Sequence, residues 1–139
     1  MEIYHQNTAL KLFCMPATSF PAGVKEAFKK LERLLPTKEG RTFFGISHGS
    51  KDGSIIYKAA VLETFDGEGT SYGLETFTLT QGDYLTETIL NWQEKMEKFE
   101  TVFKNLLADP RLDTNFPCVE WYKSDKEVMC MVRIIPGKK

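Results

Sequence analysis

The same order of expected elements occurs twice along this chain, and that repeat constrains the fold more than any single motif does. Residues 9–64 are typical of strand, helix, strand, tight turn and strand, and residues 74–135 give the same order. Each half contains a helix with one apolar stripe, which needs another element to cover it. We therefore expect a duplicated β-α-β-β fold of the α+β class with pseudo-twofold symmetry. Its antiparallel sheet carries two packed helices, and a ligand cleft lies between the halves.

The two expected helices cover about residues 20–35 and 91–108. Apolar residues recur every three or four positions in both, at Val24, Phe28, Leu31 and Leu35 in the first and at Trp92, Met96, Phe99, Phe103 and Leu106 in the second. Ser19 and Asn91 are the expected N-caps. Residues 66–73 hold three glycines and are expected to form a loop. With 139 residues, the chain is the size of one domain.

The segment 116–122, Phe-Pro-Cys-Val-Glu-Trp-Tyr, is expected to contain a strand with a carboxylate at its centre. Strand alternation places Cys118, Glu120 and Tyr122 on one face and Val119 and Trp121 on the other. Glu120 then either points to solvent or lines a cavity and meets a positive partner. The strand composition alone favours solvent, because carboxylates are rarely fully buried.

Composition excludes several classes of function. The 18 basic and 19 acidic residues give a net charge of −1, so we expect no direct nucleic-acid partner. No apolar run approaches the ~20 residues of a membrane helix, and the N-terminus lacks the pattern of a secretory signal, so we expect a cytoplasmic protein. The three cysteines are an odd, scattered set, which predicts reduced thiols and no metal site. We expect no cofactor.

Several residues allow two interpretations. Trp92 belongs to the core of the second helix or covers one end of the cleft, while Trp121 is expected in the core. Glu63 is either a solvated strand end, which we favour, or a second carboxylate beside Tyr57. His5 and His48 lie in terminal and turn-like segments with no nucleophile placed beside them, so a Ser/His or Cys/His catalytic pair has little support.

The order and spacing of several short segments resemble those of the GyrI-like small-molecule-binding domain, also called the effector-binding domain of bacterial transcription activators. The segments are Leu-Lys-Leu-Phe-Cys-Met-Pro-Ala at 10–17, Phe-Gly-Ile-Ser at 44–47, Tyr-Lys-Ala-Ala-Val at 57–61, Gly-Asp-Tyr at 82–84 and Pro-Cys-Val-Glu-Trp-Tyr at 117–122. The resemblance implies a cleft that binds many drug-like molecules, often cationic and aromatic. It also implies that Glu120 faces the ligand. Tyr57 and Tyr84 match aromatic positions near the cleft, and Tyr122 shares a face with Glu120.

Two functions follow from these residues. The first is a stand-alone protein that senses or sequesters lipophilic, cationic aromatic compounds through Glu120, Tyr122, Tyr57, Tyr84 and Trp92. Only eight residues precede the first expected strand, so a role in transcription regulation would need a separate protein partner. The alternative is a hydrolase of small activated or strained electrophiles, in which Glu120 is the general base and a tyrosine hydroxyl stabilises the developing charge.

Overall fold

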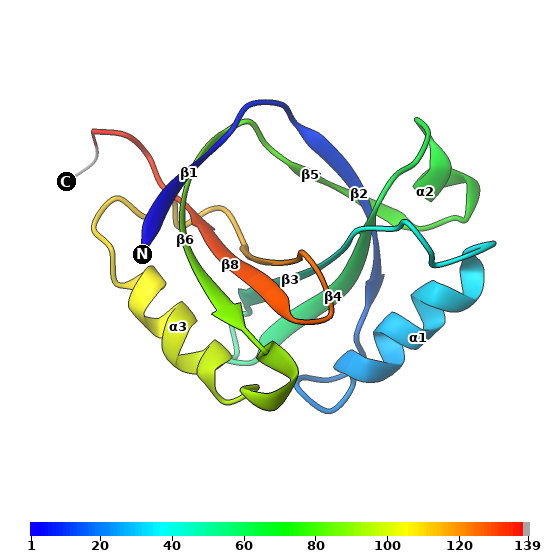
Figure 1. The fold of residues 1–139 in the computed structure, drawn as a ribbon, viewed down its shortest axis with the longest axis horizontal. Helices are drawn as coiled ribbons and strands as arrows, with labels where there is room; N and C mark the ends of the chain where they lie inside the picture. The colour runs from blue at the N-terminus through cyan, green and yellow to red at the C-terminus, as the bar shows by residue number, and fades with distance from the viewer. Residues whose placement is uncertain (138–139) are drawn as a thin grey trace. The chain divides into compact units, whose positions relative to one another are not determined.

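The computed structural model describes residues 1–137 and confirms the α+β class. The chain forms two compact units, each with an antiparallel sheet and a packed helix (Figure 1). We name them after their longest helices. The α1 unit is Ala9–Leu79, and the α3 unit is Met1–Thr8 together with Thr80–Lys139.

The α1 unit is a four-stranded sheet in the order β5-β2-β4-β3. Its elements are β2 (Leu10–Pro16), α1 (Val24–Leu34), β3 (Phe43–Gly49), β4 (Ile55–Leu62), α2 (Glu68–Ser71) and β5 (Glu75–Leu79). Ala27 and Leu31 of α1 pack on Phe13, Ala59 and Val61 of the sheet, and all five side chains are buried. This packing covers the apolar stripe that the sequence places on the first helix.

The α3 unit is a four-stranded sheet in the order β1-β6-β8-β7. Its elements are β1 (Glu2–Gln6), β6 (Gly82–Leu90), the 3-10 turn η1 (Trp92–Glu94), α3 (Lys98–Leu107), β7 (Cys118–Tyr122) and β8 (Glu127–Arg133). Val102 and Leu106 of α3 pack against Val128, Cys130 and Val132 of β8. The helix therefore covers one face of this sheet.

The duplicated topology is confirmed by strand order, although β6, and not the strand expected near residues 74–80, opens the second repeat. In each unit the first repeat strand, β2 or β6, lies next to the third, β4 or β8, which pairs with the second in a hairpin. Each unit also has an edge strand beside the first repeat strand: β5 pairs with β2, and β1 pairs with β6. The sequence did not predict β1, because Glu2–Gln6 is polar and lies at the end of the chain.

Both expected helices are shorter than their apolar stripes. Helix α1 begins at Val24, and Ser19 is not its side-chain cap; the Ser19 carbonyl instead accepts a hydrogen bond from the Gly23 N–H in a preceding turn. Helix α3 begins at Lys98. Asn91 has the left-handed φ of 56°, so the backbone turns sharply after β6 and Trp92 falls in the separate turn η1.

The glycine-rich segment contains a structured ion pair in place of a plain loop. Glu68 opens the short helix α2 with its side chain buried, and Arg41 donates to both carboxylate oxygens at 2.8 and 2.6 Å. Glu63 accepts a hydrogen bond from the Gly69 N–H at 2.8 Å. Glu63 thus has a structural contact at the start of α2, which neither sequence interpretation of this residue included.

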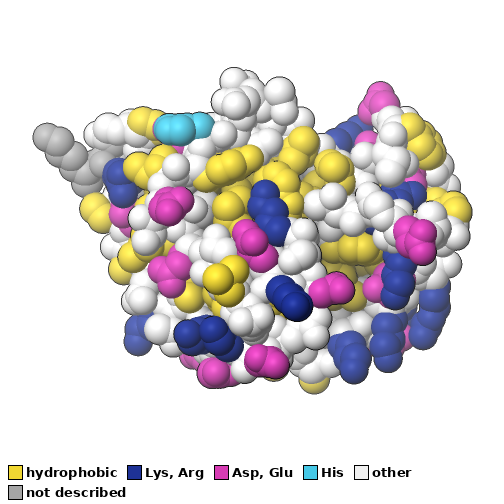
Figure 2. Space-filling model, in the orientation of Figure 1, with side chains coloured by type: hydrophobic (Ala, Val, Ile, Leu, Met, Phe, Trp, Pro, Cys, Tyr) yellow, Lys and Arg dark blue, Asp and Glu magenta, His cyan; other side chains and the backbone are white. Residues whose placement is uncertain are grey.

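Charged side chains of both signs lie among one another on the face drawn in Figure 2. This mixture agrees with the net charge of −1. Among residues 1–137, no helix has both the length and the apolar character needed to cross a membrane.

Candidate functional site

Glu120 and Tyr122 are joined by a hydrogen bond on β7. The Tyr122 hydroxyl donates to Oε1 of Glu120 at 2.6 Å, and both side chains are half-buried. Residues two apart on a strand lie on the same face, so this contact follows from strand alternation. A short hydrogen bond to a carboxylate stabilises its charged form.

This pair lies on the face of the sheet that α3 covers. Glu120 is directly opposite Cys130 of β8, and paired residues share a face. Cys130 is fully buried in the apolar cluster to which Val102 and Leu106 of α3 belong. Glu120 therefore projects from the sheet beside an apolar cluster.

Trp92 extends the pair into a row of aromatic rings. Its ring centroid is 5.0 Å from that of Tyr122, with an angle of 65° between the planes. Phe99 of α3 meets Trp92 edge-on at 6.5 Å. The Trp92 indole N–H donates to the Ser124 carbonyl at 3.2 Å, which fixes the ring against the β7–β8 turn. Three sequence-predicted site residues, Glu120, Tyr122 and Trp92, are thus brought together.

The negative charge of Glu120 acts on its cysteine neighbours. Burial, and to a smaller extent the Glu120 carboxylate, raise the pKa of Cys118 to about 11. The pKa of Cys130 is also raised, first by burial and then by Glu120 and Glu87. Both thiols are therefore protonated at neutral pH, so neither is an activated nucleophile.

Glu87 is a residue of this face that the sequence reasoning missed. It is opposite Cys130 on β6, as Glu120 is on β7, so the two carboxylates flank one buried thiol. The alternation Leu85, Glu87, Ile89 already places a carboxylate between two buried side chains. Only the strand pairing, which the sequence does not give, relates that pattern to Glu120.

Tyr84 lies on the other face of the same sheet. It is three residues from Glu87, and its side chain is fully buried. Its hydroxyl donates to the Thr80 carbonyl at 2.8 Å, and its ring meets Phe116 at 5.8 Å. Burial raises the Tyr84 pKa. The structure places Tyr84 in a core and does not bring it to the Glu120–Tyr122 pair.

Trp121 is also on the face opposite Glu120, as strand alternation predicts. It is half-buried and not fully enclosed, with the Tyr4 ring edge-on at 6.2 Å. The Lys123 ammonium lies 3.4 Å from its ring centroid, a cation–π contact. Burial lowers the Lys123 pKa.

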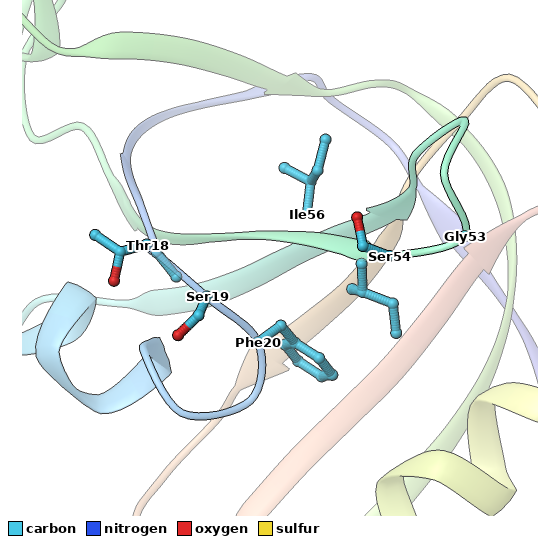
Figure 3. A pocket seen from close by; sticks show the side chains of 8 residues that line it. Thr18, Ser19, Phe20, Gly53, Ser54 and Ile56 are labelled. Atoms are coloured by element: carbon cyan, nitrogen blue, oxygen red, sulfur yellow. The ribbon is translucent and has the colours of Figure 1, made fainter.

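Tyr57 belongs to the α1 unit, where it forms a second aromatic group. Its side chain is buried, Phe20 stacks on it with centroids 5.7 Å apart and planes at 27°, and Phe28 meets it at 6.3 Å. A cavity of about 560 Å³ lies next to this group, between the segment 17–20 and the start of β4 (Figure 3). Its lining residues are Ala17, Thr18, Ser19, Phe20, Gly53, Ser54, Ile55 and Ile56.

The residues that the structure describes contain no cluster of three or more His, Cys, Asp or Glu that could hold a metal ion. Cys14, Cys118 and Cys130 are free thiols. The carboxylates and the hydroxyl described above on the α3-covered face are those of Glu120, Glu87 and Tyr122.

Comparison of sequences gives no family for this chain. No protein-family model matches it. No curated protein matches it either.

Comparison of structures gives several neighbours that span almost the whole chain. The integron cassette protein VCH_CASS2 from Vibrio cholerae has a TM-score of 0.68 and 14% identity, covering 96% of this chain and 95% of its own. SAV2435, solved bound to tetraphenylphosphonium, has a TM-score of 0.60 and 15% identity, covering 98% and 95%.

Two further neighbours are more distant. A hydrolase from Listeria innocua has a TM-score of 0.55 and 10% identity, covering 96% of this chain and 91% of its own. A protein from Staphylococcus aureus MU50, named as a candidate bacterial transcription regulator, has a TM-score of 0.51 and 16% identity, covering 96% and 99%. At such low identities the likeness concerns the fold alone. The chain shares a fold with a protein that binds a lipophilic cation.

Proposed function

We propose that this protein is a GyrI-like small-molecule-binding protein that senses or sequesters lipophilic organic cations, with Glu120 as the residue that meets the positive charge. The observation that carries the proposal is the half-buried Glu120 carboxylate, held by the Tyr122 hydroxyl beside the rings of Tyr122 and Trp92. The solved complex of SAV2435 with tetraphenylphosphonium supports the ligand class at the level of fold.

The chemistry of such binding needs only a partly desolvated carboxylate and aromatic surface. An ion pair is stronger away from bulk water, because the effective dielectric constant falls. Ring faces add cation–π attraction of about 0.5–2 kcal/mol each. A large organic cation also gains from leaving water, since most of its surface is apolar. Glu120 supplies the charge, and Tyr122 and Trp92 supply the rings.

The test is calorimetric titration with tetraphenylphosphonium. Glu120→Gln keeps the side-chain shape and removes the charge, so we expect a loss of about 1–3 kcal/mol of binding free energy, or roughly 5- to 150-fold in Kd. Neutral triphenylphosphine oxide should bind the parent and the variant equally.

The matched control is Glu127→Gln, which removes the same charge from β8 in the same unit. Glu127 is three residues from Cys130 and so lies on the opposite face from Glu120. Its substitution should leave the Kd unchanged. Equal losses in the two variants would mean that net charge alone matters, and an unchanged Kd for Glu120→Gln would refute the assignment of Glu120.

Hydrolysis is the second candidate, favoured by the 2.6 Å contact between Tyr122 and Glu120. In that function the Glu120 carboxylate takes a proton from water. The Tyr122 hydroxyl, which donates to Glu120 in the structure, would rotate to donate instead to the substrate oxygen on which charge develops. The Listeria innocua neighbour named a hydrolase supports this candidate at the level of fold. Turnover of 4-nitrophenyl acetate by the parent, abolished in Glu120→Gln and kept in Glu127→Gln, would establish it over simple binding.

A role in transcription regulation would add a protein partner to either function. The Staphylococcus aureus neighbour supports such a role only at the level of fold. Co-purification of a DNA-binding protein that depends on added tetraphenylphosphonium would test it.

A further inference from the structure

We propose that the cavity of the α1 unit is a second binding site, which takes an uncharged aromatic compound carrying an amide or similar hydrogen-bonding group. All eight residues that line it belong to the α1 unit, and none is charged. Its volume of about 560 Å³ is in the range of small-molecule sites. This ligand class differs from the cations proposed for Glu120.

The cavity begins where the pairing of β2 and β4 ends. The ladder between these strands runs to Pro16 opposite Lys58, and one more hydrogen bond joins the Ala17 N–H to the Tyr57 carbonyl at 2.9 Å. Beyond that point the segment 18–20 leads into α1 and leaves the edge of β4 (Figure 3).

The separation of the two segments leaves polar backbone groups at the cavity. Backbone groups of residues two apart on a strand point to the same side, so the N–H and carbonyl of Ile55 point to the same side of β4 as the Tyr57 carbonyl. That is the side on which residues 18–20 have turned away from β4. No hydrogen bond joins Ile55 to the described residues 17–20. An amide ligand would supply the donor and acceptor that β2 provides further along the ladder.

Three large apolar side chains that line the cavity are exposed. Phe20 is 42% exposed, Ile55 is 47% exposed and Ile56 is 37% exposed. The Phe20 ring rests on buried Tyr57, so a planar ligand could extend this stack. Clustered exposed apolar side chains of this kind are typical of binding sites.

Both walls are held by local hydrogen bonds before any ligand arrives. In one wall the Ser19 carbonyl accepts the Gly23 N–H, and a Cβ on Gly23 would meet Ser19 backbone atoms at 2.8 Å, so the turn is tight. In the other wall the hydroxyls of Ser50 and Ser54 donate to Asp52, and the Ser50 N–H donates to the Ser54 carbonyl. A preformed site loses less entropy on binding than one that must be ordered.

The test compares three ligands of one shape by NMR titration: neutral benzamide, cationic benzamidine and anionic benzoate. Benzamide should shift the backbone amide resonances of Phe20, Ser54 and Ile55 in a saturable way. The two charged compounds should bind at least about tenfold more weakly, because no charged side chain lines the cavity and transfer of an ion from water is costly.

Phe20→Ala should weaken benzamide binding about fivefold, because it removes the ring on which the ligand stacks. Phe65→Ala is the matched control, since Phe65 is also exposed in the α1 unit but does not line the cavity. Shifts confined to other residues, equal binding of all three compounds or an unchanged affinity in Phe20→Ala would overturn the proposal.

Tetraphenylphosphonium titration of Phe20→Ala separates this proposal from that for Glu120. We expect the cation to bind this variant as it binds the parent, and benzamide to bind Glu120→Gln as it binds the parent. Loss of cation binding in Phe20→Ala would show that one site serves both ligands and would overturn the second site.

Discussion

The hydrogen bond between Tyr122 and Glu120 joins two residues that the sequence alone could pair. Their two-residue spacing in an expected strand puts them on one face, and the 2.6 Å contact agrees with that. Whether the face points to solvent or to packed side chains was not decided by the strand itself. Glu120 pairs with Cys130 across the β7–β8 hairpin, and Cys130 is buried against Val102 and Leu106 of α3. The strand itself does not show which of its faces the helix covers.

Removing the Tyr122 hydroxyl should destabilise the protein through Glu120. Tyr122→Phe leaves the half-buried carboxylate without this donor, so we expect the free energy of unfolding in urea to fall by about 1–2 kcal/mol. In the Glu120→Gln background the same change should cost less, because an amide oxygen is a weaker acceptor than a carboxylate. Fully additive effects in this double-mutant cycle would contradict an energetic coupling between the two groups.

Glu68 should make stability depend on pH in the acid range. The Arg41 guanidinium, followed by hydrogen bonds from Thr64, lowers the pKa of Glu68 from 4.5 to about 2, while burial opposes the shift. The folded pKa is the lower one, so the stabilisation is fully present above about pH 4.5 and is lost as pH falls toward 2.

The measurement compares urea unfolding of the parent and Glu68→Gln across that range. At pH 7 we expect the variant to be less stable by about 3 kcal/mol, because it leaves the buried Arg41 without a counter-charge. The difference should shrink between pH 4.5 and 2. Asp109 also has a pKa of about 2, but it titrates in both proteins and cancels. A difference that does not change with pH would argue against the ion pair as its source.

At the scale of elements, apolar periodicity predicted both helices but placed their first residues too early. The helices were expected from about residues 20 and 91, and they begin at Val24 and Lys98. The spacing of Trp92 and Met96 continues the stripe of α3, yet Met96 is 57% exposed and Trp92 lies in η1. Periodicity reports which residues could share a face and does not detect a single left-handed residue such as Asn91. Because η1 is not part of α3, Trp92 lies against the ring of Tyr122.

Close packing of α2 on β2 explains Gly69, which the sequence placed only in an expected loop. A Cβ on Gly69 would overlap the Cβ of buried Phe13. Gly69→Ala should therefore lower the free energy of unfolding by about 1–3 kcal/mol, measured in urea.

Gly49→Ala is the control for that substitution. Gly49 lies in β3 with no positive φ and nothing within 4 Å of a Cβ, so its replacement should be neutral or slightly stabilising. Equal stability of the two variants would show that α2 moves freely away from β2.

At the scale of the whole molecule, the duplicated topology was predictable because each repeat carries its own signals. Turn residues, a helix stripe and alternating strands occur in both halves, so the six strands of the expected repeat all have counterparts in the structure. The edge strand β1 was not predictable, because its pairing with β6 joins residues about 80 positions apart, such as Tyr4 and Tyr84. A polar strand of this kind is defined by its neighbour more than by its own composition.

The two tryptophans of the sequence lie on opposite faces of the α3-unit sheet. Their intrinsic fluorescence can therefore report on which face a ligand binds. Trp92 contacts Tyr122 next to Glu120, while Trp121 lies beneath the Lys123 ammonium. A cation bound at Glu120 should change the fluorescence of Trp92 and leave that of Trp121 almost constant. Trp121→Phe should keep the ligand-dependent emission change, and Trp92→Phe should abolish it. The reverse pattern would place the bound cation on the Trp121 face.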